Sequence, residues 1–453
     1  MTEDVTGLPS RKCAARPSST RWPLACRAGM RPAGPSKARI CLLALYVAMS
    51  GVACSGQRNT DATPPFPRKL LGSPLSNTTP EPTAHRPIAL PVERATDFDI
   101  ASTGCSRHAF GESIAASRNT LLVGAPWRDY GARSGSDVPA ACTYQVHGER
   151  WSLTQRMTAP TPEASEGYGR AVALEESVAV VGSAGHENGD APTVAYTLVK
   201  GHATSYASLE QPGTPPGLFE EYGAAVATDG RRVIVGALLH GEPKCEGCGA
   251  FFLFDRHGHP AHVVEGSVTS ENLGASLAIS GDLVVAGAAA YFSGGRLPGA
   301  AIVYRLDHDR PRQICRLVGN AAGEQYGTSV AVDGRFVVVG ADGGPRFTLH
   351  EVRGDSCIQT DAFVSAGSAV AISMPWIVAG APRFNGGAAS SGRVGLFRVS
   401  ADGKLEHRAW ISPRRALNLG MFGASVAVTQ EWVFAGAPGV RDDDSGFVGV
   451  ARL

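Results

Sequence analysis

Two cysteines stand in the motif CEGC at 245–248, whose spacing could hold a metal ion or a redox-active disulfide. A structural zinc site needs a second pair of ligands at similar spacing, and this pair stands alone. A thioredoxin-like redox site needs a helix N-terminus beside the thiols, whereas the neighbouring glycines predict a loop. We therefore expect Cys245 and Cys248 to form a local disulfide with each other.

Histidines and acidic residues each form one dense group. The group HGHPAH at 257–262 could bind a divalent metal, but it falls at a predicted turn. The run RDDDSG at 441–446 could hold a cation weakly, but a solvated acidic loop is the simpler interpretation. The sequence contains no HExxH, GxSxG or P-loop motif. We predict no catalytic, cofactor-binding or metal-binding residue from these patterns.

The overall composition gives no reason to expect a strongly charged partner. Lys and Arg number 42, Asp and Glu number 41, and the formal net charge is +1. A surface that binds nucleic acid needs a basic excess, so no nucleic acid partner is expected. Glycine is frequent, at 55 of 453 residues, and lies between short apolar runs. Such a chain is predicted to be mostly β-structure with many tight connections.

Pairs of glycines thirteen residues apart mark a unit that occurs seven times. The first glycine is followed by two residues, an aliphatic residue and alanine, as in GTSVA at 327–331. The second glycine ends a short apolar run, as in FVVVGA at 336–341. Spacing inside the unit is constant, whereas the intervals between units vary. The motif glycines are Gly111, Gly124, Gly169, Gly182, Gly223, Gly236, Gly274, Gly287, Gly327, Gly340, Gly367, Gly380, Gly423 and Gly436.

A constant core of this length accommodates two short strands joined by a tight hairpin. A glycine-rich loop and a third strand follow, such as AIVYRL at 301–306, and then a turn and a more polar fourth strand. Four antiparallel strands repeated seven times are typical of a propeller. We therefore predict an all-β fold, a seven-bladed β-propeller of four-stranded antiparallel blades, over residues 88–453. Mostly aromatic residues precede the first glycines and should fill the gaps between blades, whereas Ala366 in the sixth unit predicts poorer or different packing there.

The sequences FGESIAASRNTLLVGAP at 110–126 and FGASVAVTQEWVFAGAP at 422–438 resemble FG-GAP repeats. These repeats form the propeller of the integrin α-chain and occur in many bacterial surface proteins of the secreted or lipoprotein type. The resemblance implies a binding or structural scaffold outside the cytoplasm and does not indicate the ligand. Some integrin-type blades hold calcium between their first two strands, but here those connections are too short for a calcium loop. Asp229 and Asp333 are therefore expected to be ordinary hairpin residues.

The segment before the repeats has the layout of an export signal and a spacer. Residues 1–29 are basic and Pro/Ser-rich, are expected to be disordered, and fit an over-extended start, whereas 30–53 read as a signal peptide. The stretch GVAC that ends at Cys54 resembles a lipobox, which predicts lipid attachment at Cys54. An ordinary signal peptide cut near Ala53, or a membrane-anchor helix, is the alternative. Residues 54–87 are Pro/Thr/Ser-rich and predict a tether.

Cysteine number favours an oxidising compartment, because six cysteines follow the predicted tether. Cys105 precedes the first strand of the first unit and Cys142 opens its third strand, so we expect these two to pair. Cys315 and Cys357 fall on the fourth strands of neighbouring units, and we expect a disulfide across that blade boundary. With Cys245 and Cys248 already paired, all six are assigned.

The last unit contains only three predicted strands, the third at 447–453. A blade with three strands would leave an unpaired edge, which propellers rarely tolerate. The segment 88–102 stands where a fourth strand precedes every other repeat. We therefore expect part of 88–102 to complete the last blade.

These patterns together predict a non-enzymatic extracytoplasmic binding or scaffold propeller tethered to a bacterial envelope. It would be an outer-membrane or cell-surface lipoprotein, or otherwise secreted. The expected partners are a protein or carbohydrate at the cell surface and the membrane through the lipid anchor. Two alternatives stay open: an extracytoplasmic enzyme with an active site in the central mouth of the propeller, and a purely structural envelope protein.

Overall fold

Short runs of apolar and small residues form 29 strands in the computed structural model. They belong to the unit His85–Leu453, and none of the described residues is helical. Accordingly, the described part of the chain holds no helix with the length and apolar character needed to cross a membrane. The described residues are 92–107, 109–126, 138–160, 167–184, 193–212, 220–241, 245–439 and 446–453.

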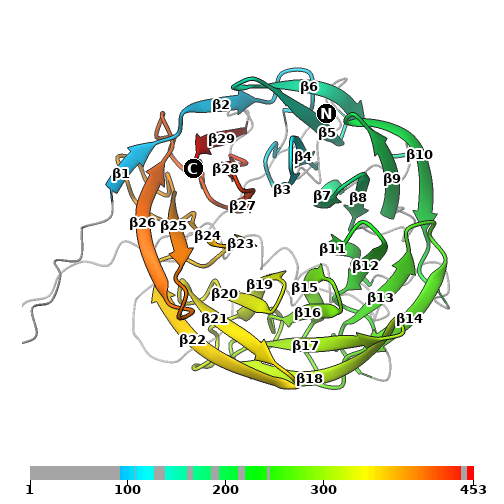
Figure 1. The fold of residues 1–453 in the computed structure, drawn as a ribbon. Coiled ribbons are helices and arrows are strands. Elements are labelled where there is room, and N and C mark those ends of the chain that lie inside the picture. The colour runs from blue at the N-terminus through cyan, green and yellow to red at the C-terminus, as the bar shows by residue number, and fades with distance from the viewer. Residues whose placement is uncertain are drawn as a thin grey trace, which may run out of the picture. The chain divides into compact units, whose positions relative to one another are not determined.

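The strands form seven sheets arranged as blades around a central axis (Figure 1). Neighbouring strands within the seven units pair in chain order and antiparallel, and the first strand of each unit lies nearest the axis (Figure 1). The prediction of an all-β, seven-bladed propeller with four-stranded antiparallel blades is confirmed. Turns between strands one and two and between strands three and four lie at one end of the blades, which we call the turn face. The longer connections lie at the other end, the loop face.

The strands of blade 1 are β3 (Ser113–Ser117), β4 (Thr120–Ala125), β5 (Ala140–His147) and β6 (Arg150–Met157). Those of blade 2 are β7 (Tyr168–Glu175), β8 (Val178–Ser183), β9 (Thr193–Val199) and β10 (His202–Leu209). Those of blade 3 are β11 (Tyr222–Thr228), β12 (Arg232–Ala237), β13 (Ala250–Asp255) and β14 (Pro260–Glu265). Those of blade 4 are β15 (Leu273–Ser280), β16 (Leu283–Ala288), β17 (Ala300–Asp307) and β18 (Arg310–Val318).

The strands of blade 5 are β19 (Tyr326–Asp333), β20 (Phe336–Ala341), β21 (Arg346–Arg353) and β22 (Ser356–Val364). Those of blade 6 are β23 (Val370–Ser373), β24 (Trp376–Ala381), β25 (Arg393–Val399) and β26 (Leu405–Ser412), with β1 (Val92–Ala95) added. Those of blade 7 are β27 (Ser425–Val428), β28 (Trp432–Ala437), β29 (Phe447–Arg452) and β2 (Phe98–Ala101).

The turns between the first two strands of each blade are as short as the repeat spacing predicts. Two residues, 334–335, connect β19 to β20, and three residues, 229–231, connect β11 to β12. A hairpin this tight fixes the register of the two strands and leaves no length for a calcium-binding loop.

Motif glycines meet across every blade boundary. A Cβ atom on Gly436 of blade 7 would overlap the carbonyl oxygen of Gly111 in blade 1. Gly111 has φ +86°, a left-handed conformation that residues with a Cβ atom rarely adopt. Glycine at both positions therefore allows the two backbones to approach closely. The same relationship occurs at Gly124–Gly169, Gly182–Gly223, Gly236–Gly274, Gly287–Gly327, Gly340–Gly367 and Gly380–Gly423.

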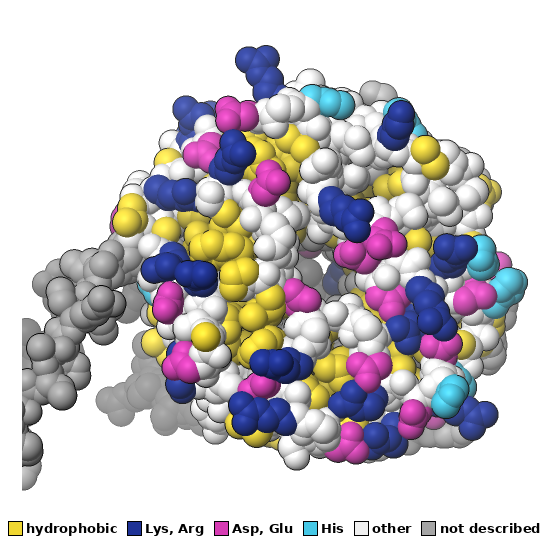
Figure 2. All heavy atoms as spheres, in the orientation of Figure 1, with side chains coloured by type: hydrophobic (Ala, Val, Ile, Leu, Met, Phe, Trp, Pro, Cys, Tyr) yellow, Lys and Arg dark blue, Asp and Glu magenta, His cyan; other side chains and the backbone are white. Residues whose placement is uncertain are grey.

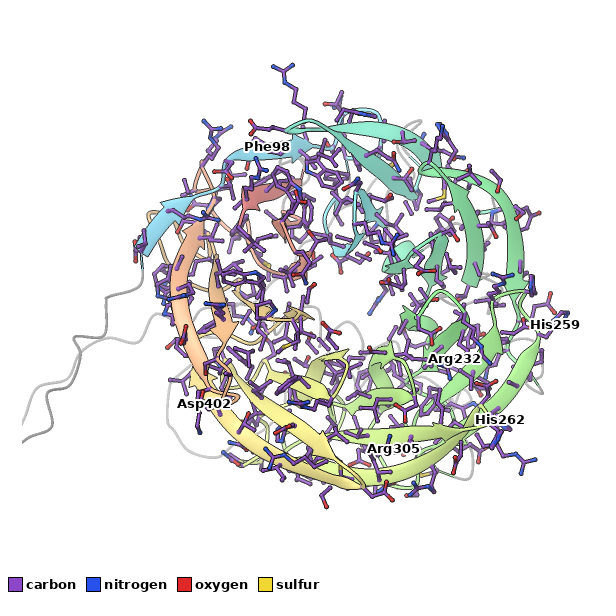
Figure 3. All side chains as sticks on the ribbon, viewed as in Figure 1. Phe98, Arg232, His259, His262, Arg305 and Asp402 are labelled. Carbon is purple, nitrogen blue, oxygen red and sulfur yellow. A yellow bond between two sulfur atoms is a disulfide. The ribbon has the colours of Figure 1, made fainter. Side chains whose placement is uncertain are left out.

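The N-terminal strand closes the ring, as the sequence predicts. Strand β2 pairs antiparallel with β29, with Phe98 opposite Val450 and Ala101 opposite Phe447. Phe98 lies on this outer strand in Figure 3 and packs edge-on against Trp432, with ring centroids 6.2 Å apart. Blade 7 is thus built from both ends of the described chain, and its outer edge strand comes from before the first repeat.

Strand β1 adds a feature that the repeat pattern does not predict. It pairs parallel with β26, so blade 6 has five strands. The amide of Thr96 donates to the carbonyl of Ser412 in blade 6 at 3.0 Å, and the next amide, of Asp97, donates to Val450 in blade 7 at 2.8 Å. The segment 92–101 therefore passes from one blade to the next within one residue and joins the two.

Aromatic residues before the first glycines fill the space between blades. Phe110, Tyr168 and Phe422 are completely buried there. In the sixth unit Ala366 is also buried, and Phe397 occupies the nearby space. Its ring lies 5.0 Å from that of Phe347 in blade 5. The boundary between blades 5 and 6 is thus filled by aromatic residues from the third strands.

Candidate functional site

The six cysteines of the propeller lie in the three pairs expected from their places on the strands. Cys105 and Cys142 have Cα atoms 6.0 Å apart. Cys245 and Cys248 have Cα atoms 5.6 Å apart, within one loop. Cys315 on β18 and Cys357 on β22 have Cα atoms 6.2 Å apart and join blades 4 and 5. These pairs are structural connections, and none lies against the pocket described below.

Several predicted features lie outside the described residues. They include the segment 1–29, the signal peptide 30–53, the tether 54–87 with Cys54, and most of the acidic run, 441–445. The structure therefore bears on the propeller alone.

The histidine group lies at the turn between β13 and β14, at the outer edge of the ring (Figure 3). One oxygen of Asp255 accepts hydrogen bonds from the amides of His257 and His259, at 2.8 and 3.0 Å. The other oxygen lies 2.8 Å from Nδ1 of His259. Burial opposes the ionised Asp255, but these bonds outweigh it and lower its pKa. Within the described ranges, no cluster of three or more His, Cys, Asp or Glu side chains could hold a metal ion.

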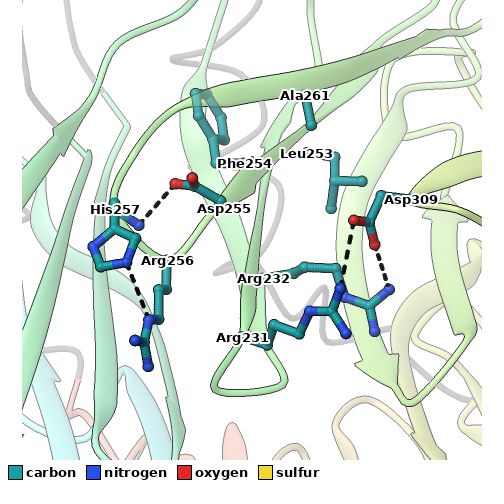
Figure 4. A pocket seen from close by; sticks show the side chains of 9 residues that line it. All are labelled: Arg231, Arg232, Leu253, Phe254, Asp255, Arg256, His257, Ala261 and Asp309. Carbon is teal, nitrogen blue, oxygen red and sulfur yellow. Dashed lines mark hydrogen bonds and ion pairs between the residues drawn. The ribbon is translucent and has the colours of Figure 1, made fainter.

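A pocket of about 250 Å³ opens beside this turn, between blades 3 and 4 on the turn face (Figure 4). Its floor is apolar and its walls carry charged side chains of both signs. The lining residues are Arg231, Arg232, Leu253, Phe254, Asp255, Arg256, His257, Ala261 and Asp309.

One wall of the pocket is held rigidly by Arg232. Its guanidinium donates to Asp229 at 2.7 and 3.0 Å and to Asp309 at 3.1 Å. It also donates to the carbonyl of Gly281 in blade 4 at 2.6 Å. The side chain is only 13% exposed, so its charge is compensated within the protein. Arg232 therefore joins blades 3 and 4 and shapes the pocket.

Two further guanidinium groups on the pocket wall form fewer interactions with the protein. Arg231 is 76% exposed and lies 3.8 Å from Asp309, which Arg232 already occupies. Among the described residues, the Arg256 guanidinium donates only to Nε2 of His257, at 3.3 Å (Figure 4). Exposed guanidinium groups above an apolar floor can bind a polar ligand that carries a negative group.

The rest of the turn face has no strong charge of one sign. Figure 2 shows basic and acidic side chains interspersed over it. One example of such neighbouring opposite charges is the ion pair between Arg305 and Asp282, both on blade 4. This distribution agrees with the small net charge of the chain and gives no extended basic surface.

Hydroxyl or carboxyl side chains stand at the inner end of each blade, six residues after its first glycine. Four of them, Ser117, Ser280, Asp333 and Ser373, accept a hydrogen bond from the next blade. Ser117 accepts from the amide of Glu176 at 3.2 Å, and Asp333 accepts from the amide of Met374 at 2.7 Å. Asp333 is therefore not an ordinary hairpin residue, because its carboxylate joins two blades. The full set is Ser117, Glu175, Asp229, Ser280, Asp333, Ser373 and Thr429.

Asp229 fits the expectation of a hairpin residue more closely. One of its oxygens accepts from the amides of Arg231 and Arg232 within its own turn, at 3.0 and 2.7 Å. Glu175 differs from both aspartates. Burial, then the charges of Glu176 and, more weakly, of Asp333, raise the pKa of Glu175.

A buried glutamate stands three residues before the first glycine in three consecutive blades. The four-residue strings EEYG, ENLG and EQYG contain it, so the sequence carried a signal that motif searching for catalytic groups missed. In blade 3 the hydrogen bond that His240 donates to Glu220 raises the pKa of His240, although burial opposes the charge. In the other two blades the equivalent glutamate pairs with an arginine from another strand, Arg316 on β18 or Arg346 on β21, so we interpret all three pairs as structural connections. The pairs are Glu220–His240, Glu271–Arg316 and Glu324–Arg346.

Comparison with solved structures gives matches of low sequence identity. A proposed 6-phosphogluconolactonase of Bacteroides uniformis has 12% identity and a TM-score of 0.47, covering 67% of this chain and 85% of its own. The periplasmic gluconolactonase of Pseudomonas aeruginosa has 18% identity and a TM-score of 0.44, covering 74% and 94%. A proposed 6-phosphogluconolactonase of Bacteroides fragilis has 9% identity and a TM-score of 0.47, covering 67% and 84%. Likeness at this level says nothing about activity.

The sequence comparisons are more specific. No curated protein matches the chain. The FG-GAP repeat family matches residues 100–138, which contain the first two strands of blade 1 and the last two residues of β2, the strand that closes the ring. The same glycine pair recurs in all seven blades. Residues 100–138 therefore match the FG-GAP repeat family, and the chain folds as a seven-bladed β-propeller in which the same glycine pair recurs in every blade.

Proposed function

We propose that this protein is a non-enzymatic binding propeller that works outside the cytoplasm. The observation that carries the proposal is the turn-face pocket between blades 3 and 4. Arg231 and Arg256 offer donors there without a full set of protein partners, and the floor is apolar. Such a site suits reversible binding of a ligand with a negative or strongly polar group. A protein or carbohydrate of the cell surface is the proposed partner class.

The paired cysteines support the proposed location. Three pairs among the described residues, one of them across a blade boundary, would be stable only where thiols are oxidised. Attachment to a bacterial envelope through a lipid on Cys54 is part of the proposal. Replacing Cys54 by Ser should release the protein from the membrane fraction or block its processing. Unchanged attachment and unchanged mature mass would contradict the lipid anchor.

A second candidate, an enzyme acting at the central mouth, has one observation in its favour. The raised pKa of Glu175 would keep more of its carboxyl group protonated, as a general acid requires. Against this, Ser117 and Asp333 at equivalent positions bind the backbone of the next blade, which is a structural task. A scaffold without a ligand is the third candidate, and it would make the pocket dispensable.

The test uses the full chain and immobilised fragments of envelope polysaccharides and surface proteins. We expect binding of an anionic or strongly polar fragment, and we expect the double variant Arg231→Ala/Arg256→Ala to lose at least tenfold in affinity. Arg150→Ala is the matched control, because Arg150 is exposed at the turn of another blade on the same face.

Each outcome separates the three candidates. Equal binding by wild type and the double variant would contradict the pocket. Turnover of any fragment by the wild type, lost in Glu175→Gln, would favour the enzyme. Absence of binding to every fragment, with envelope integrity still dependent on the protein, would favour the scaffold.

A further inference from the structure

Arg393, the first residue of β25, holds its guanidinium between two aromatic rings at the loop-face end of blade 6. Its Cζ atom lies 3.7 Å from the ring centroid of Phe384 and 3.5 Å from that of Trp410. Two rings cannot share one face of a guanidinium at these distances, so the group lies between them. Stacking on both faces fixes its plane and leaves only its edge for hydrogen bonds.

That edge has no partner among the residues that the structure describes. The Arg393 side chain forms no hydrogen bond or ion pair with them, and its Nε atom is buried without an acceptor. Other shielded arginines differ, since Arg346 pairs with Glu324 and Arg232 pairs with Asp229. A guanidinium that is oriented and partly desolvated, but lacks an anion, is ready to bind one.

Among the described residues, the acidic side chain of Glu93 lies near enough to affect this charge. Burial lowers the pKa of Arg393, while the charge of Glu93 acts in the opposite direction. Glu93 is an exposed residue of β1 and stands opposite Trp410 in the strand pairing. It forms no ion pair with Arg393 in the structure, but it would compete with an incoming anion and repel it.

Phe384, the exposed ring beside Arg393, indicates which chemical class of anion could bind there. Phe384 remains 37% exposed although it contacts Arg393. An exposed aromatic ring next to a planar donor can pack against the C–H face of a sugar ring, while the guanidinium edge donates hydrogen bonds to two coplanar oxygens. An isolated phosphate or sulfate would use the edge but would gain nothing from Phe384.

We propose that Arg393 and Phe384 form a binding site for uronic-acid saccharides. The sugar carboxylate accepts two parallel hydrogen bonds from the guanidinium edge, and the sugar ring lies on the exposed part of Phe384. The proposal rests on the proposed binding function and names a ligand class for it. The site is separate from the turn-face pocket, because it lies on blade 6 at the loop face.

The experiment titrates the full chain with digalacturonate, with the neutral galactose disaccharide, and with inorganic phosphate. Calorimetry gives the affinity, and tryptophan fluorescence reports on the stack through Trp410. We expect digalacturonate to bind at least tenfold more tightly than the neutral disaccharide. Arg393→Lys should weaken this binding by about tenfold or more, because lysine keeps the charge but loses the fork and the stacking. Glu93→Gln should strengthen it.

Two further variants keep the result interpretable. Arg398→Lys is the matched control, since Arg398 is an exposed residue at the other end of the same strand, and it should bind as the wild type does. Phe384→Leu should weaken digalacturonate binding more than acetate binding, because it removes the surface for the sugar ring as well as one of the two rings that orient the guanidinium. Thermal unfolding of each variant checks that the blade is intact.

The proposal is overturned by any of three results. These are equal binding of the charged and neutral disaccharides, full binding by Arg393→Lys, and tighter binding of phosphate or of an acidic peptide than of digalacturonate. The pocket variant Arg231→Ala/Arg256→Ala should bind digalacturonate normally. If it loses that binding and Arg393→Lys does not, the turn-face pocket is supported and this site is wrong.

Discussion

The hydroxyl of Ser425 in the last blade donates a hydrogen bond to the carbonyl of Gly111 in the first blade, at 2.7 Å. Equivalent bonds join Ser113 to Gly169 and Ser276 to Gly327, each at 2.8 Å. The hydrogen bond between blades 7 and 1, which closes the ring, is thus of the same kind as the bonds between blades 1 and 2 and between blades 4 and 5. Because this hydrogen bond joins residues 314 positions apart in the sequence, its loss should destabilise the whole domain.

Replacing Ser425 by Ala should lower the free energy of unfolding by about 1–2 kcal/mol, because it removes a buried hydrogen bond and leaves the Gly111 carbonyl without this donor. Chemical denaturation of the full chain measures the change. Ser356→Ala, at an exposed position on β22, should change it by less than about 0.5 kcal/mol. Equal effects of the two substitutions would show that the Ser425 bond does not contribute to closure.

Gly436→Ala should be far more damaging than a typical glycine substitution. The added methyl group would overlap the Gly111 carbonyl and the Ser425 hydroxyl, and both belong to the closing contact. We expect a loss of about 3 kcal/mol or more, or failure to fold. Gly344→Ala is the control, because its Cβ would meet nothing within 4 Å. Similar melting temperatures for the two variants would contradict the close approach of the blades.

Two deletions test the N-terminal strands. Removing 88–102 takes away β1 and β2 and leaves blade 7 with three strands, so the domain should unfold cooperatively at a much lower temperature. Removing 88–95 takes away β1 and leaves blade 6 with its own four strands, so the effect should be smaller. Removing 55–85 should have almost no effect. A 55–85 deletion that melts like the 88–102 deletion would exclude the strand contribution.

The sequence predicted the ring well because its information is local and repeated. The spacing between Gly327 and Gly340 predicts a two-strand hairpin, and the seven copies of this spacing predict seven blades. A missing last strand pointed to 88–102 as its replacement. Strand β1 escaped prediction because VERA has no apolar alternation and pairs parallel with a strand more than 300 positions away.

The candidate sites could not be predicted for a different reason. Arg231, Arg256 and Asp309 come from three separate turns, and only the packing of two blades brings them to one pocket. Arg393 meets Phe384 and Trp410 through a loop and a strand pairing whose register the sequence does not state. The disulfide between Cys315 and Cys357 was easier to predict from the sequence, because the two cysteines occupy nearly equivalent places in consecutive repeats.

Two equivalent tyrosines should respond differently to loss of their hydroxyl groups. The hydroxyl of Tyr326 lies 2.6 Å from Oγ1 of Thr348, whereas the buried hydroxyl of Tyr222 has no partner, because Phe252 occupies the place of Thr348. Tyr326→Phe should therefore lower the unfolding free energy by about 1 kcal/mol. Tyr222→Phe should leave it unchanged or raise it. Equal losses in denaturation experiments would show that the Tyr222 hydroxyl is satisfied in solution.

His350 should make the protein sensitive to mild acid. It is buried, with Nε2 3.1 Å from the Tyr326 hydroxyl and 2.9 Å from Oγ1 of Thr348, while Nδ1 has no partner. Burial, assisted by the charge of Arg346, lowers its pKa from 6.5 to about 4.

Between these two pH values the unfolded chain binds a proton at His350 that the folded chain does not bind. Stability should therefore fall as the pH drops from 6.5 to about 4, by up to about 3 kcal/mol from this residue alone. His350→Gln should remove this part of the pH dependence, which denaturation at a series of pH values would measure. His147→Gln, at an exposed position on β5, should leave the profile unchanged. If the His350 variant and the wild type lose stability in parallel over this range, His350 is not buried in its neutral form.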